Sequence, residues 1–133
     1  MKEIEVKILE IDKDSLVRKL ESLGAIKIFE GGVDAEFFTN REGKKVRLRK
    51  MGNENILTYK ERIEMPEAKY NNEYEISFDH YENLVSILRG IGFEKSGEKS
   101  KKRLSYRIGS IIYDFDKYED IPWFVEVESE SLE

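Results

Sequence analysis

The chain has 133 residues, of which 38% are charged, and its formal net charge is −5. This length suffices for one domain with a buried core, and the charge balance lacks the basic excess of a general nucleic-acid binder. The absence of cysteine excludes a disulfide framework and a cysteine-based metal site. No apolar run of about 18 residues and no leader-like segment is found. We therefore expect a cytoplasmic protein that has no membrane or nucleic-acid partner.

Two segments are predicted to be helices. Apolar residues recur at helical spacing in 14–23 and again in 79–91. Asp14 or Ser15 is expected to cap the first helix and Asp79 the second, and a glycine follows each segment.

Most of the remaining chain alternates between polar and apolar residues, which is typical of strands. Hairpin turns are expected at 42–43, 52–53 and 109–110, and a bulge is expected at 31–32. The candidate strands are 2–11, 25–39, 44–50, 55–63, 72–79, 100–108, 110–118 and 123–130.

The chain also resembles itself. EIEVKI followed by VRKLESLGA is echoed by EYEISF followed by VSILRGIGF, with the glutamate pairs 70 residues apart. After each helix, a strand carries a basic pair, Arg47 and Arg49 in one half and Lys101 and Arg103 in the other. These observations predict one domain over 1–133 with a pseudo-twofold repeat, whose halves are roughly 1–70 and 71–133.

Seven candidate strands carry charged side chains at every second position, with apolar residues between many of them. The charged sets are Glu3, Glu5 and Lys7; Lys45, Arg47 and Arg49; Lys60 and Arg62; Glu73 and Glu75; Lys101 and Arg103; Asp114 and Asp116; and Glu126 and Glu128. One interpretation is an antiparallel sheet with a solvated charged face. The other is a closed eight-stranded barrel whose charged face is the interior and whose apolar outer face is covered by the two helices.

The second interpretation implies a specific chemistry. Basic side chains converging in a lumen would bind phosphate oxygens. Carboxylates in the same lumen would repel phosphate unless a hard divalent cation, Mg²⁺ or Mn²⁺, stood between them. A metal that bridges carboxylates and phosphate within a basic ring is suited to phosphoryl transfer.

The charged segments resemble, in order, those of the CYTH superfamily, the triphosphate tunnel metalloenzymes. EIEVK resembles the family's ExExK signature. The resemblance continues through VRLR at 46–49, LTYK at 57–60, EYE at 73–75, KKR at 101–103, the aspartate at 116 and FVEVE at 124–128. It implies an α+β fold, with eight antiparallel strands closed into a tunnel and two helices packed outside.

The resemblance also implies residue roles. Three residues would be catalytic: Lys7, Lys60 and Glu75. The implied triphosphate-binding residues are Lys7, Arg47, Arg49, Lys60, Arg62, Lys101 and Arg103. The implied metal ligands, for Mg²⁺ or Mn²⁺, are Glu3, Glu5, Asp116, Glu126 and Glu128.

The sequence departs from the family pattern at three places. Asn71 stands where an arginine is common, Glu36 where a tyrosine is expected, and the carboxy-terminal helix is not found after Glu128. We expect metal-dependent hydrolysis of inorganic tripolyphosphate, a nucleoside triphosphate or thiamine triphosphate. The alternatives are a class IV-type adenylyl cyclase that makes cyclic AMP and pyrophosphate, and a non-catalytic triphosphate- or polyphosphate-binding module. The substrate would be the small-molecule partner of a monomer or homodimer.

Overall fold

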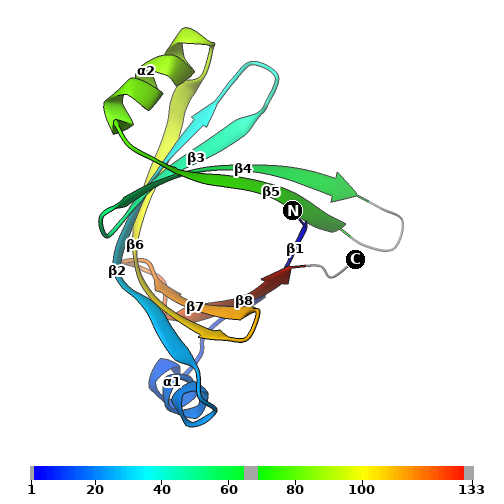
Figure 1. Cartoon of the computed structure of the whole chain (residues 1–133), viewed down its shortest axis with the longest axis vertical. Helices are drawn as coiled ribbons and strands as arrows, with labels where there is room; N and C mark the ends of the chain where they lie inside the picture. The colour runs from blue at the N-terminus through cyan, green and yellow to red at the C-terminus, as the bar shows by residue number, and fades with distance from the viewer. Residues whose placement is uncertain (1, 65–68, 131–133) are drawn as a thin grey trace. The chain divides into compact units, whose positions relative to one another are not determined.

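The computed structural model describes residues 2–64 and 69–130, and within these the side chains of 5–62 and 71–129. It contains eight strands and two helices in the described residues (Figure 1). In chain order they are β1 (Lys2–Ile8), α1 (Lys13–Ser22), β2 (Ile26–Thr39), β3 (Lys45–Met51), β4 (Glu54–Glu64), β5 (Lys69–Phe78), α2 (Tyr81–Gly90), β6 (Glu94–Ile108), β7 (Ile111–Lys117) and β8 (Phe124–Glu130).

The predicted fold class, α+β with eight antiparallel strands and two helices, is confirmed. The largest difference is β6, which begins at Glu94 rather than at residue 100. Its first part, EKSGEKS, is polar on both faces, so no alternation indicated a strand. This part nevertheless lies beside β2, because the Ser100 hydroxyl donates to Asp34 Oδ1 at 2.7 Å.

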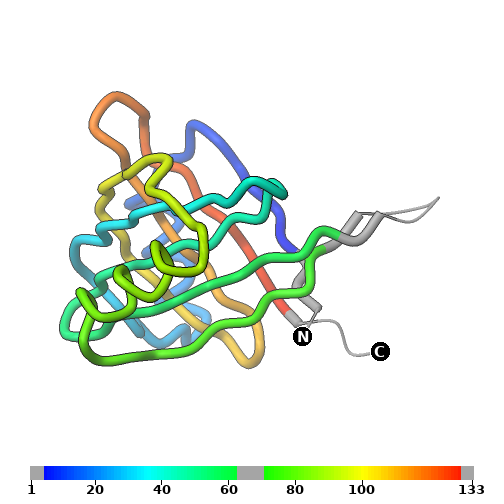
Figure 2. Tube along the Cα trace, turned by 90° about the horizontal axis from the view of Figure 1, so that it is seen from above, coloured from blue at the N-terminus to red at the C-terminus, as the bar shows by residue number. Residues whose placement is uncertain are grey.

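The chain forms two compact units. Unit 1 consists of residues 1–32 and 101–133, and unit 2 consists of residues 33–100. The strand order is β2-β6-β7-β8-β1 in unit 1 and β5-β4-β3-β2-β6 in unit 2, since β2 and β6 contribute residues to both. Within unit 2, β4 and β5 run side by side as an antiparallel pair (Figures 1 and 2). Closure of all strands into one tunnel remains a prediction.

The helix caps differ from those predicted. Asp12 caps α1, since its side chain accepts a hydrogen bond from the Ser15 backbone N–H at 3.2 Å. His80, with a φ of 58°, occupies the N-cap position of α2 and makes no capping hydrogen bond through its side chain. Asp14 and Asp79 therefore do not have the expected role. A side chain three residues before the N–H that it accepts from is well placed for capping, which favours Asp12.

The core of unit 1 lies between α1 and the apolar face of β6, β7 and β8. Leu20 of α1 packs in one cluster with strand residues that include Leu104, Phe115 and Val125. Phe115 is 1% exposed. The apolar face therefore carries the helix, and the charged face of these strands points away from it.

The core of unit 2 has the same arrangement around α2. Val85 and Leu88 of the helix pack with Phe38 and Leu48 of β2 and β3. Each helix thus packs on strands that belong to the other sequence repeat, because α1 covers β6–β8 and α2 covers β2 and β3. The compact units cut across the repeats for this reason. Among the described residues, no helix is long and apolar enough to cross a membrane.

A polar contact on the helix side of unit 2 involves Glu36, which stands where the family pattern has a tyrosine. Glu36 accepts a hydrogen bond from the hydroxyl of Tyr81 in α2 and forms a 2.9 Å ion pair with Lys95. The Tyr81 hydrogen bond lowers the pKa of Glu36, with a further contribution from Lys95. Glu36 therefore links β2 to α2 and to β6 instead of facing the charged side of the sheet.

Replacing a core residue of unit 2 should test this packing. We expect Leu48→Ala, at a position that is 0% exposed, to lower the free energy of unfolding by about 2–5 kcal/mol through lost contacts and a residual cavity. The measurement is urea denaturation followed by circular dichroism. Ile87→Ala is the control, because Ile87 is 57% exposed on α2 and should change stability by less than about 0.5 kcal/mol. Equal losses in the two variants would contradict the arrangement.

Candidate functional site

The charged face of unit 2 is assembled by the register of three strands. Arg47 pairs with Thr58, and Thr58 pairs with Glu75, so these three side chains lie in one row across β3, β4 and β5. Their neighbours at every second position share the face, on the side of the sheet away from α2. The charged members with described side chains are Lys45, Arg47, Arg49, Glu54, Lys60, Arg62, Glu73 and Glu75. Five basic side chains therefore share this face with three acidic ones.

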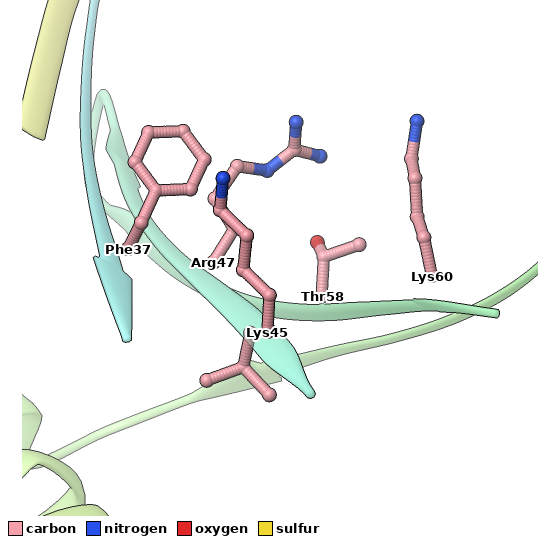
Figure 3. A pocket seen from close by; sticks show the side chains of 6 residues that line it. Phe37, Lys45, Arg47, Thr58 and Lys60 are labelled. Carbon is pink, nitrogen blue, oxygen red and sulfur yellow. The ribbon is translucent and has the colours of Figure 1, made fainter. Parts of the chain in front are cut away.

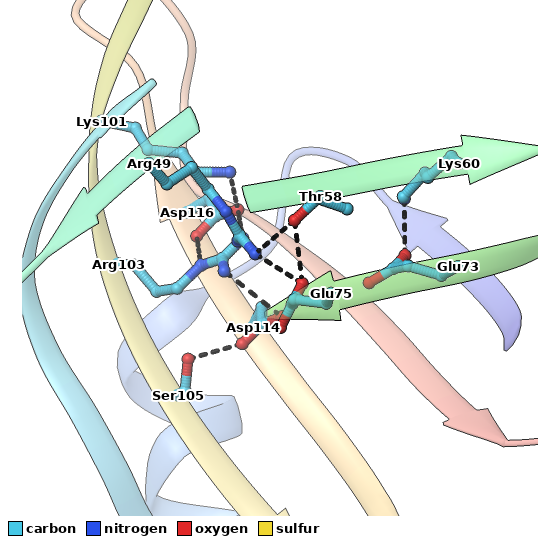
Figure 4. A network of polar contacts seen from close by, with 10 residues as sticks. All are labelled: Arg49, Thr58, Lys60, Glu73, Glu75, Lys101, Arg103, Ser105, Asp114 and Asp116. Atoms are coloured by element: carbon cyan, nitrogen blue, oxygen red, sulfur yellow. Dashed lines mark hydrogen bonds and ion pairs between the residues drawn. The ribbon is translucent and has the colours of Figure 1, made fainter. Parts of the chain in front are cut away.

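Arg49 is fixed on this face by two neighbours. Its Nη2 donates to Glu75 Oε2 at 2.8 Å and to the Thr58 hydroxyl at 3.4 Å, and this hydroxyl donates to the same Glu75 oxygen at 3.0 Å (Figure 4). Farther along the same strands, Lys60 Nζ lies 3.3 Å from Glu73 Oε2. The two carboxylates of β5 thus each contact a basic residue, which lies on the adjacent β4 for Glu73 and one strand farther, on β3, for Glu75.

A cavity of about 250 Å³ opens on the basic side of this face. Lys45, Arg47 and Lys60 line it, together with Thr58 and the Phe37 ring (Figure 3). The Lys45 ammonium lies 4.6 Å from the centroid of Phe37. The Nε of Arg47 is buried and has no hydrogen-bond partner among the described residues. A buried guanidinium nitrogen without an acceptor is unfavourable, and an anion in the cavity would supply the acceptor.

The charged face of unit 1 contains a buried ion-pair network. Asp116 is 0% exposed and accepts from Arg103 through both oxygens, at 2.8 Å from Nε and 2.9 Å from Nη2. Lys101 Nζ donates to the same carboxylate at 2.9 Å (Figure 4). Arg103 Nη1 also lies 3.8 Å from Asp114 Oδ2, and Ser105 donates to Asp114. The network therefore contains two cationic and two anionic side chains.

The pKa values in this network follow burial and pairing. Burial alone would raise the pKa of Asp116, but hydrogen bonds and charge from Arg103, with Lys101, lower it overall. Burial would lower the pKa of Arg103, yet Asp116 and Asp114 raise it. The pKa of Lys101 is lowered, first by burial and then by repulsion from Arg103, against the opposing effect of Asp116. Asp116 is therefore a charged carboxylate at neutral pH, held between two cations.

A second feature of unit 1 is a pair of adjacent carboxyl groups. Glu126 lies across from Lys7 in the register of β8 and β1, and Glu5 lies two residues before Lys7. Burial raises the pKa of Glu126, and the charge of Glu5 and a hydrogen bond with Glu5 raise it further. Two carboxyl groups in this arrangement hold a proton between them or bind a cation that relieves their repulsion.

Most of the predicted site residues fall into these two clusters. Unit 2 brings together Arg47, Arg49, Lys60, Glu73 and Glu75, with Arg62 farther along the same face of β4. Unit 1 brings together Glu5, Lys7, Lys101, Arg103, Asp116 and Glu126. Glu128 follows on the Glu126 face and pairs with Glu5 in the register. The backbone of Glu3 belongs to β1, and its side chain lies outside the described residues.

The aromatic residues of the charged faces were not predicted to belong to the site. The Phe124 ring shares the Glu126 face of β8, and Lys7 Nζ lies 4.9 Å from its centroid. Phe37 has the matching contact with Lys45 in unit 2. Alternation with Glu126 was a signal for Phe124. Phe37 precedes Phe38 in the sequence, so no period distinguished its face from the core face.

The carboxylates differ in how well they could bind a divalent cation. Among the residues that the structure describes, no group of three or more histidine, cysteine, aspartate or glutamate side chains has the geometry of a metal site. Glu5 and Glu126 have the chemistry that a divalent cation requires, because they are adjacent carboxylates that supply hard oxygen ligands and repel each other. Asp116 does not fit in its present contacts, because Arg103 and Lys101 occupy its oxygens.

The whole chain, residues 1–133, matches the model of the CYTH domain family, and the chain belongs to this family. Members of the family are triphosphatases or adenylyl cyclases, and its triphosphatases in general depend on a divalent metal. The resemblance seen in the motifs is thereby confirmed. No curated protein matches the chain in sequence.

Several solved structures have the same fold. The PH1012 protein from Pyrococcus horikoshii is 24% identical with a TM-score of 0.80, over 100% of this chain and 80% of that chain. A Vibrio parahaemolyticus protein described as a "putative adenylate cyclase" is 17% identical with a TM-score of 0.84, over 100% and 78%. HpAC1 from Hippeastrum, described as having a dominant triphosphatase activity, is 18% identical with a TM-score of 0.62, over 100% and 80%.

The contact between Arg49 and Glu75 should be measurable as a coupling energy. A double-mutant cycle of Arg49→Met and Glu75→Gln, followed by urea denaturation, should give about 1–2 kcal/mol, because Arg49 is largely buried while Glu75 is 40% exposed. The control cycle is Lys27→Met with Glu30→Gln, an ion pair of 2.8 Å between two exposed side chains, which should show no measurable coupling. A coupling no larger than that of the control would contradict the network.

Proposed function

We propose that this CYTH domain is a divalent-metal-dependent triphosphatase that acts on a small-molecule triphosphate. The basic face of unit 2 is proposed to bind the phosphates, and the carboxylates of unit 1 to hold the metal. The proposal requires the two faces to share one tunnel, as the CYTH resemblance implies.

The observation that carries the proposal is the buried Nε of Arg47 at the cavity of unit 2. It has no acceptor among the described residues, and two ammonium groups, those of Lys45 and Lys60, line the same cavity. Glu73 already contacts Lys60, but the remaining positive charge around the cavity favours an anion. A polyphosphate, with several charged oxygens in a row, would give the Arg47 Nε an acceptor and lie near both ammonium groups.

The other basic residues would extend this binding surface. Arg49 is held in place by Glu75 and Thr58, which would pre-orient its guanidinium for a ligand. Arg62, on the same face as Lys60, is proposed to contact the end of the polyanion. In unit 1, Lys7, Lys101 and Arg103 are also proposed to bind phosphate oxygens.

Hydrolysis would proceed by in-line attack of water on the terminal phosphorus. The water oxygen forms the new P–O bond, the bridging P–O bond breaks, and its electron pair leaves on the diphosphate. Both hydrogen bonds that Glu75 accepts use Oε2, which leaves Oε1 as the oxygen proposed to take the water proton. Arg47, Lys60 and Lys7 would stabilise the charge that builds on the bridging and equatorial oxygens.

The proposed metal site consists of Glu5 and Glu126, joined by Glu128 and Glu3. A bound Mg²⁺ or Mn²⁺ would neutralise phosphate oxygens and draw together the two carboxyl groups that otherwise repel. The raised pKa of Glu126 supports this assignment, because the charge that raises it is the charge that a cation would compensate.

A substrate panel tests the proposed reaction. Tripolyphosphate, ATP and thiamine triphosphate are offered with Mg²⁺ or Mn²⁺, and phosphate and pyrophosphate are measured separately. We expect phosphate release from at least one of them, abolished by a chelator and restored by added metal. Pyrophosphate together with cyclic AMP would instead identify a cyclase. Saturable binding without turnover would identify a binding module.

Removing the Arg47 guanidinium should weaken substrate binding more than it weakens the fold. We expect Arg47→Met to reduce tripolyphosphate affinity by about tenfold or more, the value of a charge-assisted hydrogen bond, with a melting temperature equal to or above that of the wild type. Isothermal titration calorimetry and a thermal melt measure the two quantities. Arg18→Met on the exposed surface of α1 is the control and should leave affinity unchanged. Unaltered affinity in Arg47→Met would contradict the assignment.

A further inference from the structure

Asp116 occupies a position where the family resemblance implies a metal ligand, yet its surroundings are those of a residue that binds cationic side chains. It is 0% exposed, and Arg103 Nε and Nη2 contact its two oxygens at 2.8 and 2.9 Å. Lys101 Nζ contacts Oδ2 at 2.9 Å. A carboxylate offers about four lone-pair directions, so three of them are already used.

A divalent cation at Asp116 would meet two obstacles. It would have to use the one remaining lone-pair direction of a fully buried carboxylate, or displace the Arg103 fork or the Lys101 ammonium. It would also lie beside these two positive charges in a site of low exposure, where their repulsion is little screened. The Glu5 and Glu126 pair differs from Asp116, because these two carboxylates repel each other. A cation between them would be attracted to both.

We propose that Asp116 is not a metal ligand in this protein but a positioning residue, which fixes the Arg103 guanidinium and the Lys101 ammonium for phosphate binding. The inference rests on the proposed function and changes one assignment within it. The proposed metal ligands are then the carboxylates of β1 and β8 that share one face, among them Glu5, Glu126 and Glu128.

The orientation of Arg103 follows from its contacts. With Nε and one N–H of Nη2 bound to Asp116 and Nη1 near Asp114, the guanidinium plane is fixed on two sides. Its remaining N–H groups therefore have a set direction, which lowers the entropy lost when an anion binds. Asp114 is itself held by the Ser105 hydroxyl.

Lys101 is held by the same carboxylate. Its Nζ donates to Asp116 Oδ2 at 2.9 Å and lies 5.6 Å from the ring centroid of Tyr118, in the loop after β7. Asp116 therefore positions the Lys101 ammonium together with the Arg103 guanidinium.

The first experiment separates a ligand from a positioning residue by direct metal binding. Mn²⁺ is titrated into Asp116→Asn and Glu126→Gln in the absence of substrate and followed by electron paramagnetic resonance. We expect Asp116→Asn to bind Mn²⁺ within about twofold of the wild type, and Glu126→Gln to bind about tenfold more weakly or worse. A loss in Asp116→Asn as large as that in Glu126→Gln would overturn the inference.

The second experiment tests the effect on phosphate binding. Tripolyphosphate affinity is measured by calorimetry without metal at one pH near 7. Affinity should be about fivefold lower in Asp116→Asn than in the wild type, because Arg103 is no longer held in place, and the difference should vanish when both carry Arg103→Met. Equal affinities would overturn the positioning role. If the wild type binds Mn²⁺ but no polyphosphate, the proposed function fails, and this assignment fails with it.

A measurement on the wild type covers the case in which Asp116→Asn does not fold. The Arg103 Nε–H signal, assigned with Arg103→Lys, is followed by ¹H–¹⁵N NMR during a titration with Mg²⁺. We expect the signal to keep its position and its protection from exchange at saturating Mg²⁺, because its hydrogen bond to Asp116 persists. Its loss on metal binding would show that the cation takes the Asp116 oxygens, which would overturn the inference.

Discussion

The packing of each helix on the strands of the other sequence repeat determines which sheet face carries the charges. Leu20 and Leu88 are buried against the apolar faces of their units, and burial of such side chains is the main favourable term in folding. Because strand side chains alternate, that burial places every second residue on the opposite face. The charged clusters are therefore a geometric consequence of the hydrophobic core, and a register shift of one residue would exchange the two faces.

The two units carry opposite excesses of charge on this common plan. By their order after the helices, β3 corresponds to β7 and β4 to β8. On the charged face β3 carries Arg47 and Arg49, whereas β7 carries Asp114 and Asp116. The basic pair of the second repeat lies on β6 instead, which is a different position from that of the first pair. The repeats therefore share a backbone plan while their charges differ, which suits one face to anions and the other to cations.

The sequence was sufficient to predict most of the helices and strands, because alternation and helical spacing are local signals. It also predicted which strand residues share the charged face, opposite the face that packs on the helices. It could not predict the pairing of charges. Arg103 meets Asp116 because β6 and β7 adopt one particular register, and no period in either strand determines that register. The first part of β6 was missed for a related reason, since its polar residues gave no alternation. Asp12 was missed as a cap because two other candidates followed it closely.

Two of the arginines are held in place by carboxylates, so their positions do not depend on a bound ligand. Arg49 and Arg103 each bind a carboxylate of another strand within their own unit, which offsets the cost of removing the guanidinium from water. Arg47 has no such partner at its Nε among the described residues, and so it has the most to gain from a ligand. On the proposed function, an anion would satisfy Arg47 in unit 2, and a divalent cation would relieve the repulsion between Glu5 and Glu126 in unit 1.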